Sequence, residues 1–129
     1  MKKKREKLER LYHEMLKNIQ DYAIVLLDLD GTILTWNKGA QEIKGYSPEE
    51  IIGKNFRIFY TPRDREESLP EKLIELAKKE GRAKHIGKRL RKDNTTFWGS
   101  VLLTTLYDEN DKVVGFIKLT RELKDNDTG

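Results

Sequence analysis

The sequence contains no cysteine, only two histidines and no long apolar run. The lack of thiols excludes disulfides, thiolate metal sites, a cysteine nucleophile and a cysteine photoadduct. A helix that crosses a membrane needs about 18 consecutive apolar residues. The basic N-terminus is also not followed by the apolar core of a signal peptide. We therefore expect a cytoplasmic protein that does not insert into membranes.

Charged residues are abundant instead, at 37% of 129 positions against 36% for the hydrophobic set. This balance indicates one small domain with a single core and a heavily solvated surface. The net charge of +4 is too small to indicate nucleic-acid binding. Phe97 and Trp98 lie near basic residues but would face opposite sides of a strand, so they cannot form one stacking platform. We expect no nucleic-acid partner.

Residues 1–20 predict an amphipathic helix, because apolar residues recur there at spacings of three and four without glycine or proline. The stripe could pack on its own domain or pair with the same stripe of a second copy. It spans fewer than three heptads, which is marginal for a free coiled coil. We name it a dimerisation or signalling helix as an expectation.

Residues 21–124 predict one α+β domain. The segments 23–27 and 32–36 flank a turn formed by Asp28-Leu29-Asp30-Gly31 and predict a hairpin. Three further strands are predicted at residues 84–91, 97–107 and 113–123, separated by turn-forming residues. Residues 125–129 are polar and are predicted to form a disordered tail.

Helix start signals fill the middle of the chain. Asn37 is a typical cap, Ser47-Pro48 with Glu50 forms a capping box, and Thr61-Pro62 begins another short helix. Residues 70–79 predict a longer helix that ends at Gly81. We expect these helices to cover one face of the sheet.

The order of these elements resembles the PAS family. The matching segments are residues 28–33, 36–37, 45–54, 91–93, 97–98 and 111–116, and the segments 59–62 and 118–123 resemble a subgroup found in bacterial and archaeal sensor kinases. The resemblance implies a five-stranded antiparallel sheet with short helices on one face. It also implies a non-enzymatic sensory or dimerisation module of a signal-transduction protein such as a two-component system, with the effector domain outside this chain.

The resemblance extends to the flavin-binding LOV domains, in which a Gly-x-Asn-Cys-Arg motif supplies a photoreactive thiol. Residues 53–57 read Gly-Lys-Asn-Phe-Arg, so Phe56 stands where that cysteine would be. The positions that match the flavin-binding amides carry Arg89, Gly99 and Thr120, none of which offers an amide's paired donor and acceptor. Flavin is therefore disfavoured.

Haem and zinc are disfavoured as well. Haem needs an axial ligand such as histidine, and both His13 and His85 are interpreted as surface residues. They lie far apart in sequence and near no cluster of carboxylates, so no zinc site is indicated. We expect no metal site. The cofactor is left open: its absence is the favoured interpretation, and a flavin bound in another mode, as in redox-sensing PAS domains, is the alternative.

The resemblance implies a ligand pocket between the sheet and the helices, or else a filled core. The pocket candidates carried over by position are Phe56, Phe59, Leu73, Leu76, Arg89, Gly99, Val101, Leu103, Phe116 and Thr120. A buried arginine costs several kcal/mol unless it is paired. If Arg89 points inward, the ligand is expected to be a small acid or amphiphile; alternatively Arg89 reaches solvent at the sheet edge, and the pocket would then be apolar.

Pure dimerisation without a ligand is the strongest alternative function. The candidate interface residues are Leu8, Leu11, Tyr12, Met15 and Ile19 in the first helix, and Trp98, Leu102 and Leu106 on the outer face of the sheet. Exposed apolar patches of this kind often mark interfaces. We expect a homodimer.

A third interpretation rests on Asp28-Leu29-Asp30-Gly31-Thr32, which resembles the first motif of haloacid-dehalogenase-type phosphatases. There Asp28 would be the nucleophile and Asp30 the general acid, with bound Mg²⁺. That fold requires parallel strands with crossover helices. The tight turn between the first two strands argues against it.

Overall fold

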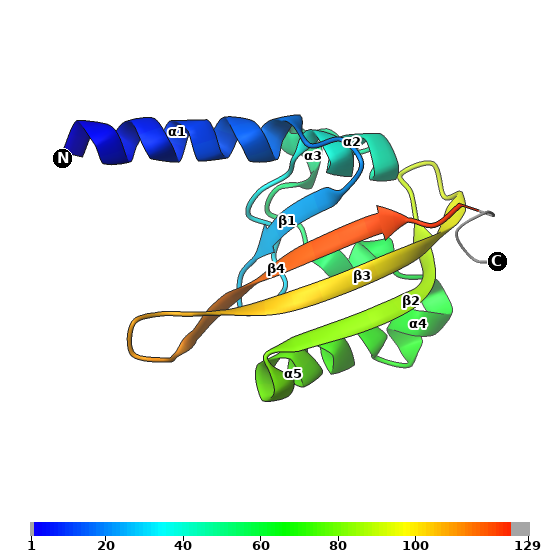
Figure 1. Ribbon diagram of the computed structural model, residues 1–129. Helices are drawn as coiled ribbons and strands as arrows, with labels where there is room; N and C mark the ends of the chain where they lie inside the picture. Colours follow the sequence, from blue (N-terminus) through cyan, green and yellow to red (C-terminus); the bar gives the residue numbers. More distant parts are fainter. Residues whose placement is uncertain (1, 125–129) are drawn as a thin grey trace.

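The computed structural model describes residues 2–124, and in them four strands form one antiparallel sheet in the order β1-β4-β3-β2 (Figure 1). The strands are β1 (Ala23–Leu27), β2 (Arg82–Leu90), β3 (Thr96–Tyr107) and β4 (Val113–Glu122). The two hairpins β2–β3 and β3–β4 are continuous in sequence, whereas β1 joins the far edge by pairing with β4. The α+β class and the three C-terminal strands are confirmed.

Short helices connect β1 to β2 and cover the inner face of the sheet (Figure 1). They are α2 (Lys38–Lys44), α3 (Pro48–Ile51), the 3-10 helix η1 (Phe56–Phe59), α4 (Pro62–Glu66) and α5 (Leu69–Glu80). The predicted caps are confirmed at Asn37, which accepts from the Ala40 N–H, and at Thr61, which accepts from the Asp64 N–H. Helix α5 ends at Gly81, whose φ of 88° is left-handed and suits glycine.

The predicted strand over residues 32–36 is wrong, so the sheet has four strands and not five. Only isolated bridges form there, between Ile33 and Leu27 and between Thr32 and Asn55. Beyond them, side chains replace the backbone ladder. The Thr35 hydroxyl accepts from the Leu26 N–H, and the Asn37 amide oxygen accepts from the Ile24 N–H. The edge of β1 is thus satisfied without a neighbouring strand.

The N-terminal helix α1 (Lys2–Asn18) projects past the sheet, and none of its residues is buried (Figure 1). Its link to the domain passes through the buried amide of Asn37, which donates to the carbonyls of Leu16, Ile19 and Tyr22. The helix prediction is confirmed, with its end at Asn18. The predicted tail over 125–129 lies outside the described residues.

The phosphatase interpretation is wrong at the level of the fold, because all strand pairs between residues 23 and 122 are antiparallel. The Asp28 carboxylate accepts from the N–H groups of Asp30 and Thr32 and thereby closes the turn. The first acid of that motif thus has a local structural role.

Candidate ligand-binding interior

The interior lies between the inner face of the sheet and η1, and most of the predicted pocket residues do face it. Those with side chains or backbones buried there are Phe56, Phe59, Leu73, Arg89, Gly99, Val101, Leu103, Phe116 and Thr120. Leu76 differs: it is 43% exposed on the outer side of α5, one helical position away from the buried stripe. The expectation that Leu76 faces the interior is therefore wrong.

Arg89 is fully buried on β2, so the alternative in which it reaches solvent is wrong. Its guanidinium lies 4.1 Å from the centroid of the Tyr60 ring, donates to the Lys88 carbonyl at 3.1 Å, and contacts His85 Nδ1 at 3.1 Å. Its Nε has no hydrogen-bond partner. Gly87 leaves room for the pair of Arg89 and His85, because a Cβ there would lie 3.3 Å from a guanidinium nitrogen and 2.6 Å from His85 Cε1. A Cβ at Gly99 would make only an ordinary contact with Arg89 Cγ, at 3.5 Å.

Two further buried cations join Arg89, and neither was predicted. Lys44, at the end of α2, and Lys118, on β4, are both fully buried. Their amines lie 4.0 Å and 5.0 Å from the centroid of the same Phe59 ring. We call Lys44, Arg89 and Lys118 the interior basic cluster. Among residues 2–124, no carboxylate forms an ion pair with any of the three.

A signal for Lys118 was present in the sequence. Phe116 and Thr120 were both expected to face inward, and strand residues two apart share a face. Lys118 lies between them and follows the same alternation. Lys44 carried a weaker signal, since it lies one helical turn after the buried Ala40. The general expectation that lysine is exposed outweighed both patterns.

Burial and mutual repulsion shift the protonation of the interior basic cluster. Burial, followed by the charge of Lys118, lowers the pKa of Lys44 well below its usual value. Burial, followed by the charge of Arg89, lowers the pKa of Lys118 to about 7. Each charge disfavours the charged form of its neighbours, as expected in a medium of low dielectric constant.

Polar neighbours do not neutralise the cluster. Lys118 Nζ donates to the Thr120 hydroxyl at 3.2 Å, while Lys44 Nζ has no hydrogen-bond partner. The Tyr60 hydroxyl is buried and also unpartnered. Burial raises the pKa of Tyr60, and burial followed by Arg89 lowers the pKa of His85. His85 is half-buried, so its interpretation as a surface residue is wrong.

Basic residues at the rim of the interior are paired with acids. Arg91 donates to both carboxylate oxygens of Glu122 at 3.2 Å and 3.1 Å and also to the Ile43 carbonyl. Lys92 donates to both oxygens of Glu50 at 3.0 Å and 2.9 Å. We call Arg91–Glu122 and Lys92–Glu50 the rim pairs. They join the β2–β3 turn to the C-terminal end of β4 and to α3, beside α2.

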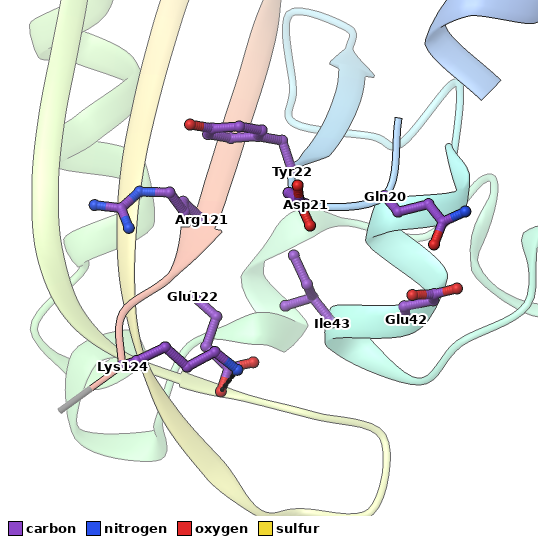
Figure 2. A pocket seen from close by; sticks show the side chains of 8 residues that line it. All are labelled: Gln20, Asp21, Tyr22, Glu42, Ile43, Arg121, Glu122 and Lys124. Atoms are coloured by element: carbon purple, nitrogen blue, oxygen red, sulfur yellow. Dashed lines mark ion pairs between the residues drawn. The ribbon is translucent and has the colours of Figure 1, made fainter. Parts of the chain in front are cut away.

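Two surface grooves open near these pairs. One, of about 490 Å³, is lined by Glu42, Ile43, Lys44, Gly45, Arg91, Lys92 and Asp93, and the side chain of Lys44 is buried behind it. The other, also about 490 Å³, lies between the α1–β1 link, α2 and the end of β4 (Figure 2). It is lined by Gln20, Asp21, Tyr22, Glu42, Ile43, Arg121, Glu122 and Lys124. The link between α1 and β1 therefore lies close to the end of β4, next to α2.

The candidate interface residues lie on two surfaces. In α1, Leu8, Leu11, Tyr12 and Met15 are exposed at 64%, 58%, 61% and 51%. Ile19 lies just beyond the helix and is half-buried. On the outer face of the sheet, Trp98 is exposed, whereas Leu102 and Leu106 are half-buried. Apolar side chains are thus accessible to solvent on both surfaces.

The sequence profile of the PAS fold matches residues 10–122. The chain belongs to the PAS family. A two-component system protein A of Emericella nidulans is 43% identical over 116 residues, which are 90% of this chain and 17% of that protein. Phototropin-2 of Oryza sativa is 34% identical over 96 residues, 73% of this chain and 10% of that protein. This PAS domain thus spans a small part of each of these relatives.

A crystal structure of a PAS domain from Colwellia psychrerythraea has a TM-score of 0.82 at 28% identity, and covers 90% of this chain and 97% of that one. The agreement confirms the PAS arrangement of sheet and helices. Within residues 2–124, no group of three or more metal-binding side chains of the His, Cys, Asp or Glu type comes together. None of the helices in this range combines the length and apolarity that crossing a bilayer requires.

Proposed function

We propose that this PAS domain is the sensory module of a cytoplasmic signal-transduction protein, and that it binds a small molecule in its interior. The supporting observation is the interior basic cluster, three fully buried basic side chains without an acidic partner among residues 2–124. Burying such groups opposes folding, whether they keep their charge or give up a proton. Residues that serve only to fill a core would be apolar, so the cluster favours a binding role over a filled core.

The interior is connected to α1 through α2. Lys44 ends α2, and Asn37 caps its beginning while it also bonds to the end of α1 and to β1. A ligand that displaced the Lys44 side chain would shift α2 and, through Asn37, the orientation of α1. Such a shift requires that the ligand bind the two arrangements with different affinity. The domain then acts by relaying a change of shape, without catalysis of its own, to an effector region of the signalling protein.

Dimerisation through α1 is the second function that we propose. The exposed stripe of Leu8, Leu11, Tyr12 and Met15 would be buried if two copies paired along this helix. In this arrangement the relay from Asn37 would change the contact between subunits. The domain would then combine sensing with homodimerisation.

Light scattering on the purified domain tests the dimer. We expect a dimer at micromolar concentration, and monomers for Leu8→Glu and Met15→Glu. Arg10→Glu is the matched control, because Arg10 lies on the opposite face of α1 and its replacement should leave the dimer intact. A monomeric wild type, or dimers unaffected by the stripe variants, would overturn dimerisation through α1.

Native mass spectrometry of the domain as purified tests sensing. We expect a bound small molecule that is released on unfolding and that raises the melting temperature when it is added back. The variant Phe59→Ala, which changes the interior and leaves Asn37 in place, should no longer hold this molecule. Absence of any bound species, with no small molecule raising the melting temperature, would overturn the sensory proposal.

A further inference from the structure

The interior basic cluster brings together charge from three separate elements. Lys44 comes from α2, Arg89 from β2 and Lys118 from β4, and all three are fully buried. Antiparallel pairing places β4 beside β3, and β3 beside β2, so these side chains meet only in the folded domain. Such an arrangement concentrates positive charge in the part of the molecule where it is least solvated.

Several donors of this cluster lack acceptors among residues 2–124. Within this range Lys44 Nζ and Arg89 Nε make no hydrogen bond, and the nearby Tyr60 hydroxyl is also unpartnered. Lys118 Nζ has a single partner, the Thr120 hydroxyl. Ammonium and guanidinium groups only donate, and a carboxylate only accepts, with two oxygens and about four lone-pair positions. A bound carboxylate would therefore satisfy groups that the chain itself leaves unsatisfied.

The surroundings of the cluster fit an organic acid better than an inorganic ion. The rings of Phe59, Tyr60 and Phe97 are buried beside it, with Phe59 under both lysine amines. Aromatic rings offer no hydrogen bonds to the outer oxygens of a phosphate, whereas they pack well on a short hydrocarbon chain.

We propose that the interior basic cluster binds the carboxylate of a small organic acid, with Arg89 and Lys118 as its donors and Lys44 at the opening. This inference names the ligand class of the proposed sensory function and rests on it. The acid is a small diacid of the succinate type, whose short hydrocarbon segment packs on Phe59. Its entry replaces the contacts of the two lysine amines with that ring.

Binding is coupled to proton uptake. Lys118 faces Lys44 on α2 and Arg89 on β2, while Tyr60 and His85 both lie beside Arg89. In the free domain these cations hold part of the lysine amines in the neutral form. A carboxylate favours the charged form of each, so a proton binds together with the acid. Affinity should therefore fall as the pH rises from 7 to 9.

The test uses domain that has been unfolded, freed of small molecules and refolded, with succinate as the probe. Titration calorimetry at pH 8 in two buffers of different ionisation enthalpy measures both affinity and proton uptake. We expect succinate to bind with uptake of up to one proton and to raise the melting temperature. Chloride at equal ionic strength and uncharged succinamide should do neither.

The variants separate this site from general electrostatics. Lys118→Met should weaken the binding of succinate at least tenfold and reduce the proton uptake. Folded Arg89→Met should weaken the binding of succinate more than Lys118→Met does. Lys92→Met, at the groove but outside the cluster, is the matched control and should change affinity less than threefold. Phosphate that binds as tightly as succinate would overturn the carboxylate class, and unchanged succinate affinity in Lys118→Met would overturn the site.

Failure of this inference remains distinct from failure of the sensory proposal. A neutral molecule found by native mass spectrometry, together with no response to succinate, would overturn the carboxylate and leave sensing supported. No bound species and no response to any small molecule would overturn both.

Discussion

The interior and the rim of this PAS domain use the same residue types in opposite ways. At the rim, Arg91 and Lys92 are each held by both oxygens of a carboxylate, whereas the interior lysines and Arg89 have no acid among residues 2–124. Rim pairs join the β2–β3 turn to its neighbours and so serve the fold. The interior basic cluster lowers the stability of the domain, and we propose that it is kept because it binds a ligand.

The largest effect that separates the two regions is expected from Lys118→Met. Methionine fills similar volume without a charge, so the ligand-free domain should become more stable by roughly 1–4 kcal/mol, the range seen when buried ionic groups are replaced by apolar ones. Urea denaturation of refolded protein at pH 7 measures this. A destabilised variant would show that the lysine serves the fold.

At the rim, we expect substitution to lower the stability of the domain, whereas substitution in the interior should raise it. Arg91→Met leaves Glu122 with the longer ion pair to Lys124, at 3.8 Å, and removes a bond to the Ile43 carbonyl. The free energy of unfolding should therefore fall by about 1.5–3 kcal/mol, as for hydrogen bonds to charged groups. The pKa of Glu122, which Arg91 lowers, should rise towards its usual value. Carboxylate titration by NMR, alongside denaturation, checks both. If Arg91→Met made the domain more stable, the proposed difference between the rim and the interior would be wrong.

The pH dependence of stability sharpens the comparison further. Lys118 has a folded pKa of about 7, and its unfolded pKa is about 10.4. Between these values the unfolded chain holds a proton that the folded domain does not. Stability should therefore rise from pH 7 to pH 9, by up to about 1.4 kcal/mol per pH unit from this group.

The raised pKa of Tyr60 acts in the opposite direction only near pH 10, so this range isolates the lysines. Melting temperatures across pH 7–9 measure the slope. It should be smaller in Lys118→Met and unchanged in Lys92→Met. A flat profile in the wild type would mean that the buried amine keeps an ordinary pKa.

The smallest effect is expected from Lys92→Met. Its pair with Glu50 is more exposed, with side-chain exposures of 54% and 37%. Exposed ion pairs contribute about 0.2–1 kcal/mol, and salt screens them. Denaturation at low and high salt should show a difference from the wild type that fades with added salt. A larger loss of stability that persists at high salt would mean that Lys92–Glu50 stabilises the domain as much as Arg91–Glu122 does.

Local chemistry explains which elements were predictable. The caps at Asn37 and Thr61, the stop at Gly81 and the three C-terminal strands follow from neighbours in sequence. The fifth strand was not predictable in this way. Residues 32–36 have strand-like composition, but the side chains of Thr35 and Asn37 take the positions that a backbone ladder would need, and this depends on where β1 lies.

The sequence by itself determined the α+β class, the amphipathic α1 and the resemblance to the PAS family, because periodicity and turn chemistry depend on neighbouring residues. It left open whether Arg89 faces the interior, which the structure decided. Only the tertiary structure decided that Lys44 and Lys118 join Arg89, since they come from α2, β4 and β2 and meet through antiparallel pairing. It also decided that no carboxylate among residues 2–124 pairs with these three side chains, whereas Arg91 pairs with Glu122 and Lys92 pairs with Glu50. Charge is a property of residues, but its compensation depends on which residues the fold brings together.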